Sequence, residues 1–341
     1  METIEVVLIA GDGIGPEVSS AACEVIDAAG APIRWLPMPA GVAAIESHGD
    51  VLPELTLTAL RRVKVGLKGP VGTPIGGGFR SVNVTLRKTL DLYAAVRPVR
   101  TLPGIKTRYE NVDLVIFREN TEGLYTGIEN QVAPGVVTSM KVATEMACTR
   151  IARAAFEYTE RRGRKKVSVF HKANIMKLTD GLFLRCAKAV RDASFPHIHY
   201  EEIIIDNACM QLVKDPTRYD VLLMENLYGD LVSDLCAGMV GGLGVVPGAN
   251  IGKDGAVFEA VHGSAPDIAG KGVANPLACI MSGVMMLNYL ADRHGSQLCR
   301  SAAERIKTAY DRTLADGSVL TRDLGGTAST AEFTSALISR L

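Results

Sequence analysis

The sequence has no surplus of either charge, because 37 lysines and arginines stand against 37 aspartates and glutamates in 341 residues. Binding to nucleic acid or to an anionic membrane surface needs an excess of cations, so the balance argues against both partners. Aromatic residues are also scarce, at 5%, whereas glycine is abundant, with 34 residues. This composition favours tight loops and small-residue packing over a β-sandwich.

A disulfide framework and a structural zinc site are both disfavoured. The seven cysteines are odd in number and dispersed, and no two of them form a C-x-x-C pair. The first residues carry acids where a signal or transit peptide needs cations. No run approaches the ~20 apolar residues that cross a membrane. We therefore expect a soluble protein in a reducing, cytoplasmic compartment.

Short apolar runs separated by helical patterns predict an α/β fold with a largely parallel sheet. The first unit is a strand over residues 6–10, a glycine-rich loop over 11–16 and a helix that ends at Gly30. Similar strand-like runs follow at residues 63–67, 114–117, 167–170, 203–205 and 221–224. Further helices are expected over 144–161 and after the capping-box pattern of residues 329–332. Long Gly/Pro-rich loops are expected at 69–78, 241–252 and 262–276.

The loop Gly11-Asp12-Gly13-Ile14-Gly15-Pro16 invites comparison with the dinucleotide fingerprint G-x-G-x-x-G. It follows a strand and opens a helix, as the fingerprint requires, but Pro16 stands where the last glycine belongs. No acid ends a second strand about 20 residues further on. A tight strand-to-helix turn explains the glycines equally well, so a Rossmann site is not indicated.

Arginines and small polar residues gather in one stretch of the chain. Ser81, Asn83 and Arg87 fall within about one and a half helical turns, and Arg97 and Arg118 follow. Guanidinium groups pair with carboxylates or phosphates, and hydroxyl and amide groups fix orientation. The stretch is therefore a candidate anion site, although each arginine alone is more often a solvated surface residue.

Three aspartates form a candidate site for a hard cation. Asp230 and Asp234 stand at i, i+4 on a helix after the 221–224 strand, and Asp206 is expected at the end of the 203–205 strand. Converging carboxylates suit magnesium or manganese, and no His/Cys cluster competes for a softer metal. The alternative is an ordinary acid pair near a helix N-terminus.

Two further residues are candidates for moving protons. Tyr125 follows the segment Arg118–Gly123, and Lys172 follows the 167–170 strand. A lysine or tyrosine in such a place is more often a surface residue, and His171 and His262 are more often structural.

Taken together, these motifs resemble the β-decarboxylating dehydrogenases, which comprise the isocitrate, isopropylmalate and homoisocitrate dehydrogenases. The resemblance rests on long motifs between the first strand and residue 276: G-D-G-I-G-P-E (11–17), R-P-V-R (97–100), R-E-N-T-E-G (118–123), residues 226–234 and H-G-S-A-P-D (262–267). It implies a two-domain fold with a large, mixed, mostly parallel sheet that is not a Rossmann fold. Residues 1–97 and 247–341 would form the large cofactor-binding domain, and 98–246 the small domain with the metal ligands and the dimer interface.

The resemblance also implies roles for single residues. Arg87, Arg97 and Arg118 would bind substrate carboxylates, with Ser81, Asn83 and Asn174 beside them. Tyr125 would protonate the enolate, and Lys172 would assist removal of the hydroxyl proton. Asp206, Asp230 and Asp234 would hold Mg2+ or Mn2+. The residues implied for the cofactor are Thr73, His262, Gly263, Ser264, Ala265, Pro266, Asp267, Ile268 and Asn275.

Within the family, S-x-N-x-x-x-R at residues 81–87 looks like isocitrate dehydrogenase, because isopropylmalate enzymes carry apolar residues there. Asp267-Ile268 looks like the pair that selects NAD, since a carboxylate accepts from ribose hydroxyls and repels a 2′-phosphate. Lys172 and Asp206 would act across an obligate homodimer, with residues 132–141 as the inter-subunit arm. The alternatives are homoisocitrate, 3-isopropylmalate or tartrate as substrate, or a non-catalytic regulatory subunit.

Overall fold

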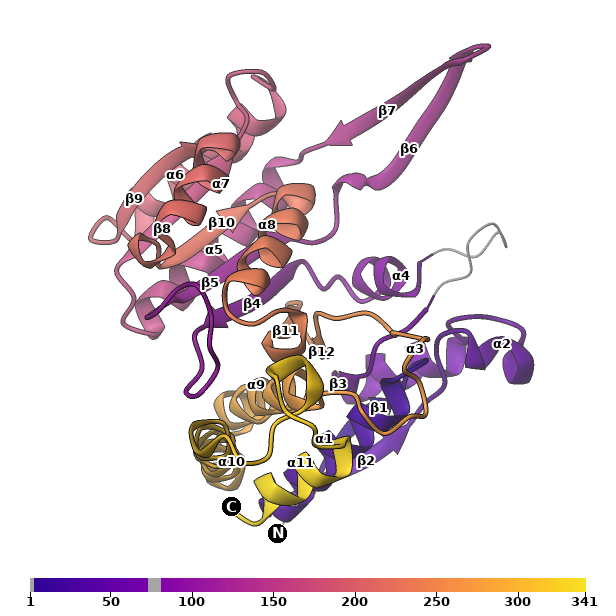
Figure 1. Cartoon of the computed structure of the whole chain (residues 1–341). Coiled ribbons are helices and arrows are strands. Elements are labelled where there is room, and N and C mark those ends of the chain that lie inside the picture. The colour runs from indigo at the N-terminus through magenta and orange to yellow at the C-terminus, as the bar shows by residue number, and fades with distance from the viewer. Residues whose placement is uncertain (1–2, 73–80) are drawn as a thin grey trace.

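A ten-stranded sheet runs through the whole molecule in the computed structural model, which describes residues 3–72 and 81–341 (Figure 1). The strand order is β2-β1-β3-β12-β11-β4-β5-β10-β8-β9. Within the described residues, β11 is antiparallel to both of its neighbours and β4 also pairs antiparallel with β5. The other pairs are parallel. The mixed, mostly parallel α/β architecture expected from the sequence is confirmed.

The strands are β1 (Ile4–Ile9), β2 (Ile33–Pro37), β3 (Val65–Lys68), β4 (Ala94–Arg100), β5 (Asp113–Glu119), β6 (Gly123–Ala133), β7 (Val136–Val142), β8 (Lys166–His171), β9 (His199–Ile204), β10 (Val221–Met224), β11 (Pro247–Ile251) and β12 (Ala256–Ala260). The α-helices are α1 (Gly15–Ala28), α2 (Ala43–His48), α3 (Glu54–Val63), α4 (Val82–Thr89), α5 (Glu145–Arg161), α6 (Thr179–Ser194), α7 (Ile205–Lys214), α8 (Asn226–Met239), α9 (Leu277–His294), α10 (Gln297–Asp316) and α11 (Thr330–Ile338).

The local signals in the sequence set several helix ends. Pro16 stands in the first turn of α1, where its missing N–H costs no helical hydrogen bond. Thr144 caps α5 by accepting a hydrogen bond from the Ala147 amide. Ser329 and Glu332 form the predicted capping box of α11. These contacts satisfy backbone amides that the first turn of a helix leaves without partners.

The two ends of the chain meet in one half of the molecule. Strand β12 pairs with β3, and α9 packs against α1, α10, β11 and β12, so the last hundred residues return to the first helix and to β3. The other half contains β5, β8, β9 and β10 with α5 to α8 (Figure 1). The strands β11 and β4 join the halves through one continuous sheet. The domain boundaries at residues 97 and 247 remain a prediction.

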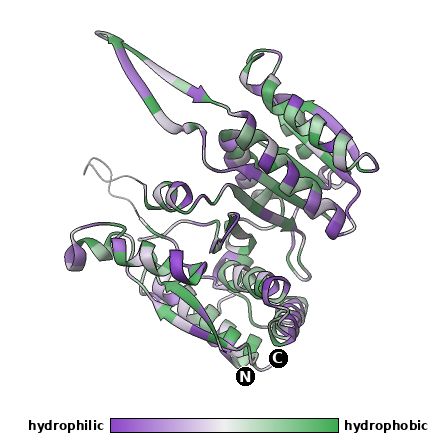
Figure 2. Cartoon of the chain, turned by 180° about the vertical axis from the view of Figure 1, so that it is seen from behind, coloured by the Kyte–Doolittle hydropathy of each residue, from purple (hydrophilic) through white to green (hydrophobic). Residues whose placement is uncertain are grey.

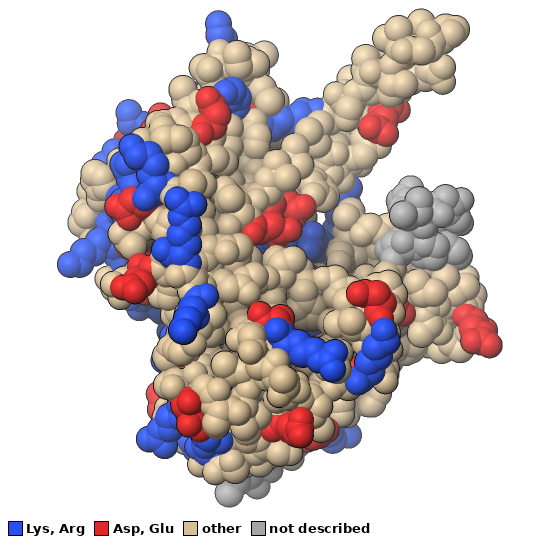
Figure 3. Space-filling model, in the orientation of Figure 1, with Lys and Arg blue, Asp and Glu red and all other residues tan. Residues whose placement is uncertain are grey.

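The hairpin β6–β7 projects from the body as a long arm (Figure 1). Apolar and polar residues are mixed along it (Figure 2), and its far end carries no charged side chain on the face shown in Figure 3. Exposed apolar side chains on the arm are Ile128, Val132, Val136, Val137 and Met140. Elsewhere on the face in Figure 3, charges of both signs are interspersed, in keeping with the neutral total.

Two expectations about local structure were wrong. The strand placed at residues 203–205 ends at Ile204, and Asp206 lies in the first turn of α7, because the apolar run continues directly into a helix. The expected loop 241–252 contains β11, whose small residues fit between β12 and β4. In the part of the chain that the structure describes, no helix is long and apolar enough to span a membrane.

Candidate active site

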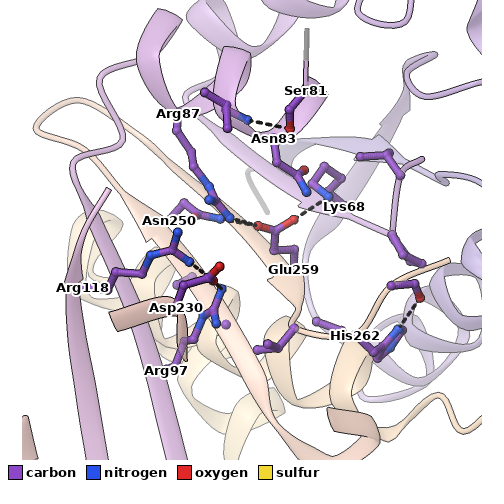
Figure 4. A pocket seen from close by; sticks show the side chains of 18 of the residues that line it. Lys68, Ser81, Asn83, Arg87, Arg97, Arg118, Asp230, Asn250, Glu259 and His262 are labelled. Atoms are coloured by element: carbon purple, nitrogen blue, oxygen red, sulfur yellow. Dashed lines mark hydrogen bonds and ion pairs between the residues drawn. The ribbon is translucent and has the colours of Figure 1, made fainter. Parts of the chain in front are cut away.

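A cavity of about 270 Å³ lies where the two halves of the sheet meet (Figure 4). Its walls come from the end of β3, the helix α4, the strands β4, β5, β11 and β12, and the helix α8. Six of the residues proposed from the sequence to bind substrate or move protons line it together with Asp230, His262 and Gly263: Ser81, Asn83, Arg87, Arg97, Arg118 and Tyr125. The structure therefore brings together residues that are almost 200 positions apart in the chain.

Arg118 is held almost rigidly in this wall. It is 1% exposed, and its guanidinium donates to the Asn226 side-chain oxygen at 2.7 and 3.1 Å and to Asp230. Gly229 allows the Arg118 side chain to pack against α8, because a Cβ at Gly229 would lie 2.5 Å from that side chain. Burial, reinforced by Arg87 and Arg97, lowers the pKa of Arg118 to about 10.

Arg97 is a second buried cation in the same wall. It donates to the Ser233 hydroxyl and lies 3.8 Å from Asp230 and 3.6 Å from Asp234. Burial and the neighbouring Arg87 lower its pKa. Burial alone would raise the pKa of Asp230, but Arg118 and the Tyr125 hydroxyl bring it below its ordinary value. Asp230 is therefore a carboxylate under neutral conditions.

The cavity retains a positive surplus after these pairings. Among its described lining residues, four cations, Lys68, Arg87, Arg97 and Arg118, face two carboxylates, Asp230 and Glu259. Arg87 helps to lower the pKa values of Arg97 and Arg118, and an anion in the cavity offsets this repulsion between cations. The site therefore favours a multiply charged anion.

Lys68, Glu259 and Asn250 form a buried network at the floor of the cavity that sequence reasoning missed (Figure 4). Lys68, 2% exposed, pairs with Glu259, and Glu259 also accepts from Asn250 at 2.7 Å and lies 3.4 Å from Arg87. Burial would raise the pKa of Glu259, but Lys68 and Arg87 lower it to about 2. A signal was present, because Lys68 ends an apolar strand at the carboxyl edge of a parallel sheet, where ligands bind.

We expect Lys68→Met to destabilise the fold by about 3–5 kcal/mol, because it leaves the Glu259 carboxylate buried without its main partner. Because the pKa of Glu259 is depressed, its carboxylate stabilises the folded state fully above about pH 4.5. This stabilisation is lost as the pH falls toward 2. Removing Lys68 raises that pKa, so acid unfolding should begin at a higher pH.

Thermal and acid unfolding monitored by circular dichroism measure both effects. The double variant Lys68→Met/Glu259→Gln is the control and should recover part of the lost stability, since no unpaired charge remains. Unfolding curves of Lys68→Met that coincide with those of the wild type at every pH would contradict the prediction.

Ser81 and Asn83 occupy the first turn of α4 at the cavity mouth. Ser81 caps the helix by accepting from the Val84 amide at 3.4 Å. Asn83 lines the cavity, and its side-chain oxygen is buried without a hydrogen-bond partner among the residues that the structure describes. An unpaired buried acceptor is costly, so this amide is poised for a ligand.

Tyr125, at the start of β6, faces the same carboxylate as Arg118. Its hydroxyl donates to Asp230 at 2.5 Å, and the Arg118 guanidinium lies 5.1 Å from its ring centre. Burial and the bond to Asp230 raise the pKa of Tyr125, so the phenol keeps its proton under neutral conditions. Lys88 of α4 fixes the backbone here by donating to the Tyr125 carbonyl at 3.1 Å.

The residues predicted to act across a dimer, together with Asn174, lie apart from the cavity of their own chain: Lys172, Asn174 and Asp206. Lys172 pairs with Asp206, and Asn174 is exposed in the loop that follows Lys172. None of the three lines the cavity. The side chain of Asp206 is 69% exposed, and Lys172 lowers its pKa. This pair therefore presents a cation and an anion to the outside of the chain.

The carboxylates suit a divalent cation only in part. Asp230 and Asp234 lie one helical turn apart on α8, with Asp230 on the cavity wall and Asp234 half exposed beside it. Among the described residues of one chain, no three His, Cys, Asp or Glu side chains converge. Two oxygen donors with an open side fit a hard cation if a third ligand comes from outside the chain.

The predicted cofactor loop connects β12 to α9. His262 and Gly263 line the cavity, and the ring atom Nε2 of His262 is buried with no hydrogen-bond partner in residues 3–72 and 81–341. Burial lowers the pKa of His262, so its ring is neutral. Ser264, Ala265, Pro266, Asp267 and Ile268 continue the loop away from the cavity, with Asp267 exposed. Asn275 accepts from the Leu277 amide and donates to Asp323. Thr73 lies outside the described residues.

A known protein family matches almost the entire chain. The family model described as isocitrate/isopropylmalate dehydrogenase covers residues 5–337. The chain belongs to this family. A solved structure, an isocitrate dehydrogenase from Methylococcus capsulatus, superposes with a TM-score of 0.93 at 46% identity and covers 99% of each chain. The dehydrogenase fold expected from the motifs is therefore confirmed, and its division into two domains stays a prediction.

Relatives with different printed functions are almost equally similar. An NAD isocitrate dehydrogenase catalytic subunit, mitochondrial, from Arabidopsis thaliana is 53% identical over 99% of this chain and 88% of its own length. A regulatory subunit of the same type of enzyme from Dictyostelium discoideum is 50% identical over 99% and 92%. A chloroplastic 3-isopropylmalate dehydrogenase from Solanum tuberosum is 51% identical over 93% and 87%. Substrate and catalytic competence therefore have to be argued from the residues of the site.

Proposed function

We propose that this protein is a catalytic NAD-dependent isocitrate dehydrogenase, which oxidises and decarboxylates isocitrate to 2-oxoglutarate and carbon dioxide and forms NADH. The observation that carries the proposal is the cavity in which Arg87, Arg97 and Arg118 converge with the side-chain amide of Asn83. A tricarboxylate of charge near −3 matches the positive surplus and can accept a hydrogen bond from the Asn83 amide nitrogen, whereas an isopropyl group cannot.

Different residues of the cavity bind different carboxylates of the substrate. Arg118 and Arg97 bind the carboxylate nearest Asp230, and Arg87 reaches from α4 toward the opposite side of the cavity. Ser81 and Asn83 then stand beside the carboxylate that distinguishes isocitrate from isopropylmalate. Because the arginines are buried and preorganised, little conformational entropy is lost when the substrate binds.

Residues in and beside the cavity suit a divalent cation and NAD. Asp230 and Asp234, with Asp206 of the partner subunit, would hold Mg2+ or Mn2+, and the loop 262–275 would hold NAD. When bound, NAD would supply the hydride acceptor and the divalent cation would polarise oxygens of the substrate. The exposed carboxylate of Asp267 supports NAD over NADP, because it would repel a 2′-phosphate.

Two residues would serve the proton transfers. Lys172 of the partner subunit assists removal of the hydroxyl proton as the carbinol is oxidised. Loss of carbon dioxide from the resulting β-keto acid leaves an enolate, and the Tyr125 phenol donates a proton to its carbon. Tyr125 suits this step because its raised pKa keeps it protonated and the bond to Asp230 fixes its hydroxyl in the cavity wall.

A homodimer would bring Lys172 and Asp206 to the cavity of the second copy. Exposed apolar side chains occur on the elements that carry this pair, the loop after β8 and α7, and on α8: Ile175, Leu178, Met210, Val213 and Leu231. Such side chains, together with the uncharged end of the β6–β7 arm, suit a buried interface. Some relatives are named catalytic or regulatory subunits. The alternative to a homodimer is therefore an assembly of different subunits. A regulatory role is disfavoured here because Tyr125, Lys172 and all three aspartates are present. A cytoplasmic location stays a prediction.

A panel of substrates tests the proposal. Purified protein should turn over isocitrate with NAD and a divalent cation at least ten times faster than 3-isopropylmalate, homoisocitrate or tartrate, because an unpaired polar group penalises the wrong substrate by roughly that factor or more. Replacing NAD by NADP, or adding EDTA, should remove most of the activity. Faster turnover of 3-isopropylmalate would overturn the choice of substrate, and a preference for NADP would overturn the role of Asp267.

A further inference from the structure

The segment Gly11–Glu17 has no role in the chemistry above, and its glycine pattern does not make a Rossmann fingerprint. Its contacts nevertheless converge on the loop 262–275. The Ile14 amide donates to the Ser264 carbonyl at 2.9 Å, near the start of that loop. The Glu17 carboxylate accepts from the Ala274 amide at 3.0 Å, near its end. One short segment therefore holds both ends of the predicted cofactor loop.

The contact at the start of the loop is too close to admit any side chain at Gly13. Gly13 adopts a positive φ of 60°, and a Cβ at this position would lie 2.0 Å from the Ser264 carbonyl oxygen. The next loop residue, Ala265, is held at φ 39°, which is unfavourable for any residue with a Cβ. Such a backbone conformation persists only where its surroundings impose it. The strain at Ala265 thus indicates that this end of the loop is held from outside.

The contact at the far end is reinforced by α11. The Thr330 hydroxyl lies between the Glu17 carboxylate and the Ala274 carbonyl oxygen, 2.6 Å from the latter. The Thr330 amide donates to Gly272 at 2.9 Å. Ala274 and Thr330 are both buried, so a charge-assisted bond here is strong and poorly replaced by water. Glu17 joins α1, α11 and the loop at one point.

The same segment also holds a second part of the cavity lining. Asp12 accepts hydrogen bonds from the amides of Val42, Ala43 and Gly72 at 2.7 to 3.0 Å, and its own amide donates to Pro70. Pro70 and Val71 line the same cavity as His262 and Gly263. Two loops that line the cavity are therefore bonded to one segment.

We propose that Gly11–Glu17 is a positioning clamp that preorganises the dinucleotide-binding loop, with Glu17 as the residue that fixes the loop's far end. This inference rests on the proposed function for the identity of the ligand. The hydrogen bonds that form the clamp do not depend on that identity. Glu17 does not touch the reacting atoms. Its removal should therefore weaken binding of the dinucleotide without altering the binding of isocitrate.

The test compares Glu17→Ala with Glu17→Gln and with Glu24→Ala, an exposed acid on the same helix whose side chain contacts only Ser20 among the described residues. NADH binding is measured by fluorescence titration without turnover, and amide hydrogen exchange is followed over residues 263–275. Glu17→Ala should bind NADH roughly tenfold more weakly or worse and exchange faster in this loop alone, as expected for loss of a charged hydrogen bond that orders it. The KM for isocitrate should stay within about twofold of the wild type.

Glu17→Gln keeps an acceptor oxygen and should restore most of the NADH affinity, and Glu24→Ala should behave as the wild type. Glu17→Asp moves the carboxylate back by one methylene. It replaces Glu17→Ala in the comparison if the alanine variant does not fold. Unchanged NADH affinity and unchanged exchange in the Glu17 variants would overturn the clamp. Failure of the wild type to bind NADH would overturn the proposed function instead, and the exchange data would still decide the clamp.

Discussion

Tyr125→Phe should lower the overall rate of isocitrate oxidation by about 10²–10⁴-fold, the usual contribution of a positioned general acid. The substitution removes only the hydroxyl that donates to Asp230, and the ring can keep its place under Arg118. Substrate binding should change little, because the arginines and Asn83 are untouched. The loss should therefore appear in kcat rather than in KM.

The two chemical steps can be separated by supplying the β-keto acid intermediate, oxalosuccinate. With NADH it reports hydride transfer, and alone it reports decarboxylation and protonation. We expect the second reaction to be slowed much more than the first in Tyr125→Phe. Tyr289→Phe is a matched control, since Tyr289 is also half-buried beside an arginine and bonds to it through its hydroxyl. Equal losses in both steps would contradict the assignment of Tyr125 as the acid.

Much of the fold could be predicted because buried parallel strands leave an unmistakable pattern. The run at 221–224 matches β10 to the residue, and Thr144 and Ser329 cap the helices that they were expected to begin. The pattern fails where an apolar run continues into a helix, as at Ile204–Ile205, because periodicity over so few residues cannot separate the two. It also fails at β11, whose glycine, alanine and proline read as loop but fill a narrow place in the sheet.

The candidate site was predictable only where its residues sit in a recognisable motif. Ser81, Arg87, Arg118 and Tyr125 do so, and they line one cavity. Lys68 and Glu259 do not, since each looks like an isolated charge at the end of a strand until the sheet places them side by side. Their pairing depends on contact between β3 and β12, which are almost 200 residues apart. No local signal carries that information.

A single chain does not explain the position of Lys172, and the dimer that the sequence motifs imply leads to a specific prediction about subunits. Tyr125 lines the cavity, whereas Lys172 of the same chain does not. If the partner supplies the lysine, a chain carrying Lys172→Met and a chain carrying Tyr125→Phe should each be nearly inactive as homodimers. Their heterodimer should regain about half of the wild-type activity, because one of its two symmetry-related sites then contains both native side chains.

The reciprocal heterodimer provides the control, with each heterodimer isolated by two different affinity tags and assayed for isocitrate-dependent NADH formation. A wild-type chain paired with the double variant Lys172→Met/Tyr125→Phe has one defect in each shared site, so it should be nearly inactive. Sites built within one chain would give the opposite pattern: about half activity for the wild-type pairing and none for the two single variants. The two arrangements predict opposite activities for the two heterodimers. A change in protein stability therefore cannot produce the same pattern. A half-active pairing of wild type with the double variant would place Lys172 in the cavity of its own chain and remove the need for a dimer.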